Sequence, residues 1–315
     1  ATSCYPGTAL ESDFSRAHPE WRDGNCLRYN VPEVRQYILG LYREMLEIGA
    51  PGISIDYCRY PDGLDQAATV TAFHRELRAL TREFAARRKR PVPILVRFPA
   101  TGVRQCDKFD YRTWVKEGLV DYLCPSNLQG RHHHFDLKPY LAAVQGSPCK
   151  LLPVVDGLGW GPEFPGMFLW RVKQCYEAGA DGVYIYQGDA RVLGRPEDRR
   201  VMRMLGSSAA VARWWEQELA ERARYSKSIT ITTPHHLDAY SPWERLRIWT
   251  DGIPLGALEV YLDDKLISRF AGPPYLVGSE DYRDDRVIPT GEHVLRVRAR
   301  DGEGWLEQTF AIKGH

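Results

Sequence analysis

The sequence contains no long apolar run and no marked excess of either charge. No stretch approaches the roughly 18 consecutive apolar residues that a membrane-spanning helix needs, so a membrane span is not expected. Lys and Arg number 42 against 41 Asp and Glu, which leaves a formal net charge of +1. Because this balance produces no broad electrostatic field, it argues against nucleic acid and anionic membranes as partners.

Cysteine is also sparse, and its pattern argues against several kinds of site. The seven cysteines are an odd number and show no CxxC spacing, so neither a disulfide framework nor a zinc site is expected. Cys58 and Cys124 lie in strand-like segments, where they would act as small buried hydrophobic residues. Cys4 and Cys26 could form one loop disulfide in an oxidising compartment, because spacing alone does not decide the question.

The chain begins at Ala1 without an initiator methionine or a leader-like segment. This start fits a processed or trimmed product. We therefore expect a secreted, periplasmic or cell-surface protein.

From residue 31 to about residue 224, amphipathic segments alternate with short apolar ones. The first predicted helix, 31–49, has Pro32 in its first turn and apolar residues at helical spacing, namely Val34, Ile38, Leu41, Met45 and Ile48. The other predicted helices cover 67–88, 110–118, 136–145, 165–179 and 214–223, and the predicted strands cover 52–58, 93–98, 121–126, 151–156 and 182–187. Such alternation predicts an α/β fold with a parallel sheet covered by helices.

A (β/α)8 TIM-type barrel is the predicted architecture for residues 1–225. The sequence lacks GxGxxG and Walker motifs, which argues against the phosphate-binding open sheets. Most strands end in polar or aromatic residues, as barrel strands do at the face that carries the active site. With five clear strands and a sixth suggested near residues 1–6, the first strands of a closed barrel are missing from this chain.

After about residue 225 the hydrophobic period changes from helical to two. Alternating segments at 228–234, 245–252, 258–267, 274–278 and 293–312 are separated by turn residues. We predict a small all-β sandwich of the Ig or fibronectin type III kind over residues 226–315.

Asp56 is the leading candidate for a catalytic residue. It follows Ile53 and Ile55 at the end of a predicted strand, where sugar-cleaving barrels hold a nucleophile or an acid/base. The structural alternative is an aspartate that accepts a loop hydrogen bond or pairs with Arg59 or Arg97. Placement at the strand end favours catalysis.

Residues 17–61 read AHPEWRDGNCLRYNVPEVRQYILGLYREMLEIGAPGISIDYCRYP. This segment resembles the glycosyl-hydrolase-like family 10 of TIM-barrel proteins, which show an HPEW segment, an N-P-E-V-R helix and a strand that continues D-Y-x-R-Y-P. Weaker resemblance continues in VDYLCPSNLQG (120–130) and GADGVYIYQ (179–187). The resemblance implies that Asp56 takes the place of the strand-four acid of the family, and that Arg59, Tyr60 and Pro61 follow it.

Two departures from the family pattern affect the expected substrate contacts. Pro51 stands where the family has an aspartate before the strand glycine. Ser126 and Asn127 stand where the family has glutamine or tyrosine after a strand-six proline.

Glycoside hydrolysis normally uses a second carboxyl group. Asp156 is the predicted second catalytic residue, because it ends a strand before a glycine-rich loop, although a turn-capping aspartate explains it equally well. Asp189 is the next candidate, with a helix N-cap as the favoured alternative. Glu20 and Asp23 precede the first complete helix and are weaker candidates.

The remaining candidates are residues that would bind substrate. Arg59 and Arg97 would bind a substrate anion or, as the favoured alternative, hold Asp56 ionised. Trp160 would stack on a sugar ring. His132 would contact sugar hydroxyls, and no metal is expected at the run 132–134, since adjacent side chains point apart. The other predicted substrate-binding residues are Tyr60, Asn127, Gln187 and Asp189.

The sequence thus predicts an enzyme, a glycoside hydrolase that cleaves a polysaccharide or a cell-wall glycan by a carboxylate mechanism, with no cofactor. The expected partner is a carbohydrate substrate. One alternative is a non-catalytic glycan-binding protein on a degenerate barrel, which Ser126 and Asn127 make plausible. Another is an interaction protein in which the β-sandwich is the working part.

Overall fold

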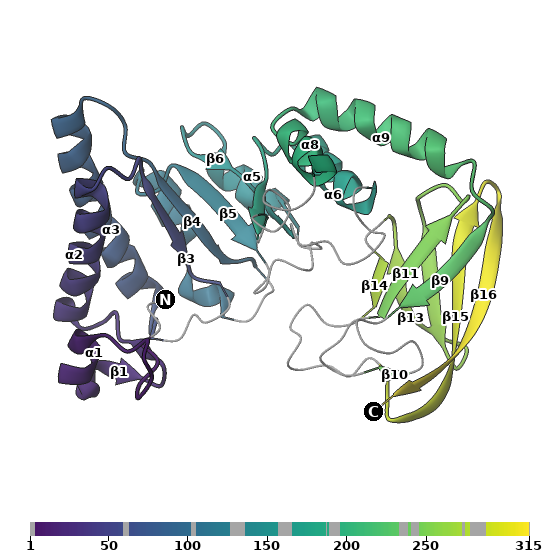
Figure 1. Cartoon of the computed structure of the whole chain (residues 1–315), viewed down its shortest axis with the longest axis horizontal. Coiled ribbons are helices and arrows are strands. Elements are labelled where there is room, and N and C mark those ends of the chain that lie inside the picture. The colour runs from purple at the N-terminus through teal and green to yellow at the C-terminus, as the bar shows by residue number, and fades with distance from the viewer. Residues whose placement is uncertain are drawn as a thin grey trace. The chain divides into compact units, whose positions relative to one another are not determined.

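The computed structural model describes residues 4–58, 63–101, 105–126, 136–156, 166–186, 188, 196–232, 239–240, 246–272, 275–277 and 288–314. The chain divides into two compact units (Figure 1). Unit 1 comprises Ala1–Val154 and Ala178–Tyr184, and unit 2 comprises Val155–Glu177 and Ile185–His315. The domain boundary expected between residues 225 and 226 stays a prediction.

A four-stranded parallel sheet forms the centre of unit 1, which confirms the expected α/β class. Its strands lie in the order β3 (Ile53–Asp56), β4 (Ile94–Pro99), β5 (Tyr122–Ser126) and β6 (Lys150–Leu151). The register places Asp56 beside Arg97, and Arg97 beside Cys124. Since side chains alternate along a strand, these three residues belong to one face of the sheet, which we call the polar face.

Helices cover the opposite face of this sheet. They are α2 (Pro32–Glu47), α3 (Ala67–Arg88), α4 (Tyr111–Lys116) and α5 (Lys138–Val144). Phe98, one residue after Arg97, packs against Trp114 of α4 and Tyr140 of α5, with ring centroids 5.8 and 6.0 Å apart. The polar face is therefore the side of the sheet that points away from these helices.

The buried side of α2 differs from the sequence prediction. Val34 and Ile38 are buried as their spacing indicates, and so is Leu46, which the prediction did not include, whereas Leu41, Met45 and Ile48 are 37%, 48% and 87% exposed. At 100° per residue these three share one stripe with Val34 and Ile38, and Ile48 is the C-cap residue. The described residues thus cover the N-terminal half of the predicted stripe and leave its C-terminal half exposed.

The N-terminal segment forms short elements that the sequence did not predict. They are α1 (Asp13–Ala17), the 3-10 turn η1 (Pro19–Trp21), and a hairpin of β1 (Arg22–Asp23) and β2 (Cys26–Leu27). No strand occurs between Cys4 and Leu10, so the sixth strand suggested there is not formed in the described part of that segment. Cys4 and Cys26 are buried, and the possible disulfide between them is not formed.

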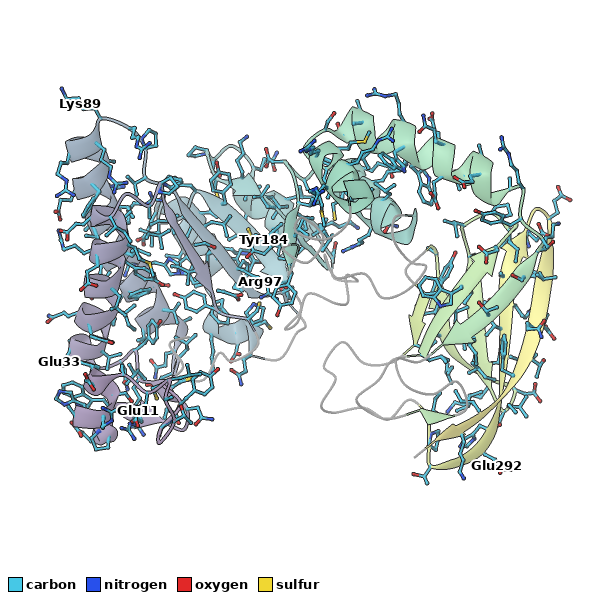
Figure 2. The ribbon with its side chains drawn as sticks, viewed as in Figure 1. Glu11, Glu33, Lys89, Arg97, Tyr184 and Glu292 are labelled. Atoms are coloured by element: carbon cyan, nitrogen blue, oxygen red, sulfur yellow. The ribbon has the colours of Figure 1, made fainter. Side chains whose placement is uncertain are left out.

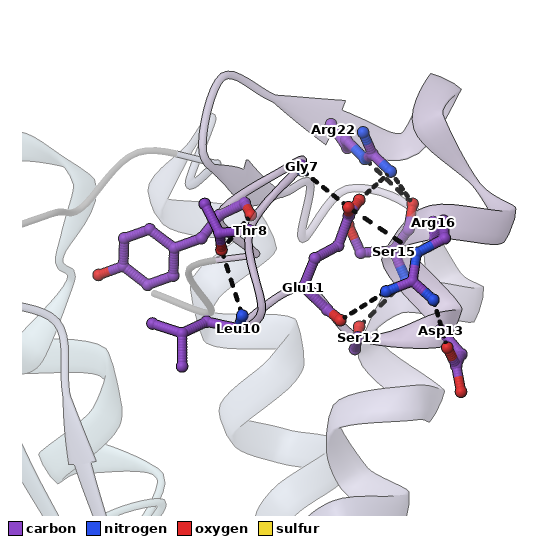
Figure 3. Close-up of polar contacts among 10 residues, drawn as sticks. Gly7, Thr8, Leu10, Glu11, Ser12, Asp13, Ser15, Arg16 and Arg22 are labelled. Atoms are coloured by element: carbon purple, nitrogen blue, oxygen red, sulfur yellow. Dashed lines mark hydrogen bonds and ion pairs between the residues drawn. The ribbon is translucent and has the colours of Figure 1, made fainter.

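A buried carboxylate fixes this segment in place (Figure 3). The side chain of Glu11 is 6% exposed and pairs with Arg22, and it accepts a hydrogen bond from the backbone of Gly7 at 2.8 Å. The segment also reaches the chain that follows β3, because the amide of Tyr29 donates to the carbonyl of Gly63 at 3.0 Å. The N-terminal segment is therefore hydrogen-bonded to Gly63, between β3 and α3.

The strand predicted over 151–156 is interrupted. After β6 the chain passes Leu152 and Pro153 and continues as β7 (Val154–Asp156), which pairs with β8 (Tyr184–Tyr186). Pro153 has no amide proton to donate to a ladder, which is one reason for the interruption. The described strands do not form a closed barrel, and the TIM-type architecture stays a prediction.

Unit 2 contains the ends of β7 and β8, helices, and the strands of two further sheets. Its helices are α6 (Gly166–Glu177), α8 (Pro196–Met204), which the sequence did not predict, and α9 (Ser208–Arg222). One sheet has the order β10-β16-β15-β12-β13 and the other has the order β14-β11-β9. The strands are β9 (Ser228–Thr232), β10 (Ala239–Tyr240), β11 (Leu246–Asp251), β12 (Leu258–Leu262), β13 (Lys265–Phe270), β14 (Tyr275–Val277), β15 (Gly291–Asp301) and β16 (Gly304–Gly314).

The two sheets of unit 2 share one hydrophobic core. Ile231 and Ile248 from the smaller sheet and Val260 and Val297 from the larger sheet belong to it. The segments of period two thus become strands, while the Ig or fibronectin type III assignment stays a prediction. Among the residues described above, no helix is both long and apolar enough to cross a membrane.

Candidate functional site

Asp56 ends β3 on the polar face, and both of its carboxylate oxygens are bonded. Oδ2 lies 2.7 Å from Nη1 of Arg97, and Oδ1 accepts the backbone N–H of Cys58 at 2.8 Å. The Asp56 side chain is nevertheless 45% exposed. The result is a carboxylate that is fixed in orientation and still open to solvent.

Arg97 forms the buried side of this pair. Its side chain is 1% exposed, and its Nε donates to Oγ of Ser126 at 3.2 Å. A guanidinium removed from water is costly unless anions and acceptors compensate it. Asp56 and Ser126 provide this compensation, and the role of Arg97 toward Asp56 or a substrate anion stays a prediction.

Two thiols lie close to the pair, and both are protonated. Burial raises the pKa of Cys58 to about 12, with Arg97 opposing and Asp56 adding to the shift. Burial also raises the pKa of Cys124 well above its usual value. Since the thiolate is the reactive form of cysteine, neither residue has the character of a nucleophile.

Tyr184 is a site residue that the sequence prediction missed. It is half-buried at the start of β8, and its amide donates to the carbonyl of Pro153 at 3.0 Å. Burial raises the pKa of Tyr184, and the charge of Asp56 raises it further while Arg97 opposes the change, so the phenol lies within electrostatic range of the pair (Figure 2). The only sequence signal was its position in a predicted strand, three residues before the polar end at Gln187.

A buried aromatic cluster supports the end of β3 from the helix side. The hydroxyl of Tyr57, the residue after Asp56, lies 3.2 Å from Nε2 of His74 on α3. Burial lowers the pKa of His74 to about 3, so the imidazole is neutral. Trp114 packs against this ring at 4.3 Å and donates its indole N–H to Thr71 at 3.0 Å. His74 is therefore a packing residue and not an acid or base.

Two further aspartates lie at the opposite, amino ends of strands. Asp121 accepts the amide of Ile94 at 2.6 Å and pairs with Arg78 at 2.8 Å. Asp181 accepts the amide of Leu151 and pairs with Lys150, both at 2.9 Å. Each carboxylate connects the start of one strand to a neighbouring strand, which is a structural role.

The structure brings together two of the predicted site residues, Asp56 and Arg97. Asp156 ends β7 in unit 2, and its side chain lies outside the described part of the chain. Glu20, a weaker candidate, lies 3.3 Å from Nδ1 of His18. Asp23, the other weaker candidate, ends β1, and the remaining predicted residues lie outside the described residues, namely Arg59, Tyr60, Asn127, His132, Trp160, Gln187 and Asp189. Their roles stay predictions.

The described residues contain no group of three or more His, Cys, Asp or Glu side chains that could hold a metal ion. The histidine run 132–134 lies outside them.

Comparisons with known proteins found matches among solved structures. No family model and no curated protein matches the chain. Similar solved structures include an endo-β-1,4-mannanase from Thermotoga petrophila, at 10% identity over 79% of this chain and 62% of the mannanase, with a TM-score of 0.36. They also include the chitinase ChiW from Paenibacillus sp. str. FPU-7, at 11% identity over 91% of this chain and 44% of the chitinase, with a TM-score of 0.39.

A β-glucuronidase from Bacteroides uniformis is similar at 11% identity over 79% of this chain and 31% of that enzyme, with a TM-score of 0.25. The chain spans less than two thirds of the length of each of these three structures. Their TM-scores all lie below 0.5, so no functional residue is transferred from them.

Proposed function

We propose that the protein is a glycoside hydrolase of TIM-barrel type, and that its active site lies on the polar face at Asp56. One observation carries this proposal: the Asp56 carboxylate is held by two hydrogen bonds at the carboxyl end of a parallel strand and is still 45% exposed. Barrel enzymes build their active sites at that end of the strands. The resemblance of residues 17–61 to glycosyl-hydrolase-like family 10 supports the same reaction class.

The contacts of Asp56 indicate which of the two carboxyl roles it takes. Arg97 is a permanent cation that donates to Oδ2, and the Cys58 amide donates to Oδ1, so both oxygens of Asp56 act as hydrogen-bond acceptors. An ionised carboxylate serves as a nucleophile or as a base that activates water, and it does not supply a proton. Asp56 is therefore the nucleophile or base in our proposal.

The leaving oxygen needs a proton from a second carboxyl group. Asp156 is our proposed donor, because it ends a strand, as Asp56 does. Tyr184 keeps its phenolic proton. We propose that it donates a hydrogen bond to the substrate near Asp56. The substrate is proposed to be a polysaccharide or a cell-wall glycan.

The test measures new reducing ends released from a panel of polysaccharides and cell-wall glycans. The wild-type protein should act on at least one of them, and Asp56→Asn should lower turnover by about 100-fold or more while glycan binding persists. Asp13→Asn is the matched control, because Asp13 is a fully solvated aspartate whose contact is with neighbouring Arg16. Full turnover in Asp56→Asn would remove Asp56 from the mechanism.

A second function is favoured by one observation, that both oxygens of Asp56 are already engaged by protein groups. A carboxylate used in this way can be purely structural, and the polar face would then bind a glycan without cleaving it. Affinity electrophoresis against the same panel separates the two functions. Retarded migration with no product release would support the binding protein.

A further inference from the structure

His293 joins two segments of unit 2 that are separate in sequence. Its Nδ1 lies 2.6 Å from Oδ2 of Asp263, and its Nε2 lies 3.1 Å from the carbonyl oxygen of Pro289. Asp263 belongs to the turn between β12 and β13, and Pro289 precedes β15. We call His293, Asp263 and Pro289 the imidazole latch.

Both contacts require the imidazole to donate a hydrogen bond. A carbonyl oxygen accepts only, and so does an ionised carboxylate. Neutral imidazole carries one N–H, so either neutral tautomer would turn a lone pair toward one of the two oxygens. The imidazolium has an N–H at each nitrogen and satisfies both partners. The geometry therefore fits the protonated ring.

The surroundings favour the same charged form. The hydrogen bond to Asp263 raises the pKa of His293, and the carbonyl groups of Pro289 and Thr290 act in the same direction. In turn, the amide of Val294, which donates to Asp263 at 2.9 Å, and then His293 lower the pKa of that aspartate. Each member of the pair thus stabilises the charge of the other.

Other charged side chains lie on the surrounding elements. They are Asp264 in the turn, Lys265 on β13, Glu292 and Arg296 on β15, and Lys313 on β16. Asp264 lies 3.2 Å from Arg296, and Glu292 lies opposite Lys313 in the register of β15 and β16. Of these groups and Asp263, all in the described part of unit 2, Asp263 is the one whose side chain bonds to the His293 ring.

The latch acts on residues that matter for the core of unit 2. Pro289 follows Ile288, which is 1% exposed and belongs to the core between the two sheets. On the other side, Asp263 has a φ of 48°, a left-handed conformation that side-chain hydrogen bonds help to stabilise. The His293 ring therefore holds the β12–β13 turn through Asp263, and it holds the segment next to the buried Ile288 through Pro289.

We propose that the imidazole latch is a pH-sensitive device: protonated His293 holds the start of β15 to the β12–β13 turn, and loss of the Nε2 proton releases Pro289. The proton leaves Nε2 because Nδ1–H faces a carboxylate, whereas Nε2–H faces a neutral carbonyl group. A histidine whose pKa rises on folding stabilises fully below the unfolded value of about 6.5, and this stabilisation is lost as pH rises through the folded value.

The test is NMR of protein with 15N-labelled histidine, which shows whether each ring nitrogen carries a proton. One imidazole, identified by its absence in His293→Asn, should stay protonated at both nitrogens to higher pH than an unperturbed imidazole, whose pKa is about 6.5. It should lose the Nε2 proton first as pH rises. A transition of the His293 signal at or below that of an unperturbed imidazole, or loss of the Nδ1 proton first, would overturn the proposal.

Two further variants keep the test informative if His293→Asn folds poorly. Asp263→Asn should move the transition of the His293 signal to lower pH, because the carboxylate partner is gone. His18→Asn is the matched control, since His18 also faces a carboxylate, that of Glu20, but belongs to unit 1. An unchanged His293 transition in Asp263→Asn would contradict the latch.

Hydrogen exchange provides a readout of the release itself. After correction for the intrinsic exchange rate at each pH, a peptide that covers residues 288–295 should lose protection as the His293 signal titrates. In His293→Asn the protection of this peptide should not follow that transition. Equal pH dependence in both proteins would show that the ring contacts do not hold this segment.

Discussion

The guanidinium of Arg97 is 1% exposed, whereas the carboxylate of Asp56, whose Oδ2 lies 2.7 Å from Nη1 of Arg97, is 45% exposed. The pair therefore has a buried cationic end and an open anionic end. Because the cation is held by the core and the anion reaches the surface, the arrangement presents a fixed negative charge on the polar face.

Arg97→Met should destabilise unit 1 and disturb Asp56. The variant removes the cation that orients Asp56 and the donor to Ser126, so we expect a loss of about 1–3 kcal/mol in the free energy of unfolding. Urea denaturation followed by fluorescence measures this loss. Arg112→Met is the control, because Arg112 is exposed on α4. Equal stability of the two variants would show that the buried pair contributes nothing.

Gly63→Ala and Gly40→Ala should have opposite effects on stability. Gly63 has a φ of +75°, and a Cβ there would lie 2.4 Å from the carbonyl oxygen of Leu27, so we expect a loss of at least about 1–2 kcal/mol. Gly40 lies within α2, and a Cβ there meets nothing within 4 Å. Alanine at position 40 should stabilise the helix by about 0.5–1 kcal/mol. Thermal unfolding of both variants checks the contrast in sign.

His74 should make the stability of unit 1 depend on pH in the acidic range. Burial lowers the pKa of His74 to about 3, whereas in the unfolded chain it is about 6.5, so the unfolded state binds one more proton between these values. The free energy of unfolding should then fall with decreasing pH by up to about 1.4 kcal/mol per pH unit from this residue. Urea denaturation across this range should give a smaller slope for His74→Gln. Parallel slopes would mean that His74 is protonated in the folded protein.

Asp181 should contribute to resistance against acid. Burial opposes the shift, but the amide of Leu151 and the ammonium of Lys150 outweigh it and lower the pKa of Asp181. A carboxyl group with a lowered pKa stabilises the fold above the unfolded value of about 3.9, and this stabilisation is lost as pH falls through the folded value. Asp181→Asn should therefore be less stable than the wild type at neutral pH, and the difference should shrink in acid. A constant difference between the two proteins would contradict this assignment.

Local periodicity was sufficient to predict many elements of the fold. The helix predicted over 67–88 matches α3, and the segments of period two after residue 225 form strands. These elements can be predicted because the period of a helix or a strand alone determines which of its side chains lie on the same face. The same reasoning misplaced Leu41, Met45 and Ile48, since a repeat shows that a helix is amphipathic but does not show how much of its stripe a neighbour covers.

The candidate site was predictable only in part. The sequence indicated Asp56 and left Arg59 and Arg97 as alternative partners, while Tyr184 carried no clear signal. Arg97 is 41 positions from Asp56, and the register of β3 against β4 selects it. Strand register depends on the packing of both faces of the sheet, so it cannot be read from either strand alone.

By itself, the sequence determined the α/β class of unit 1, the change to period two after residue 225, and the position of the Asp56 carboxylate at the end of β3. The tertiary structure decided the partners: Arg97 for Asp56, Tyr57 for His74, and Pro289 and Asp263 for His293. The physical reason is the range of the forces involved. Secondary structure follows from repeats within a few residues, whereas the burial and charge of a side chain depend on segments that only folding brings together.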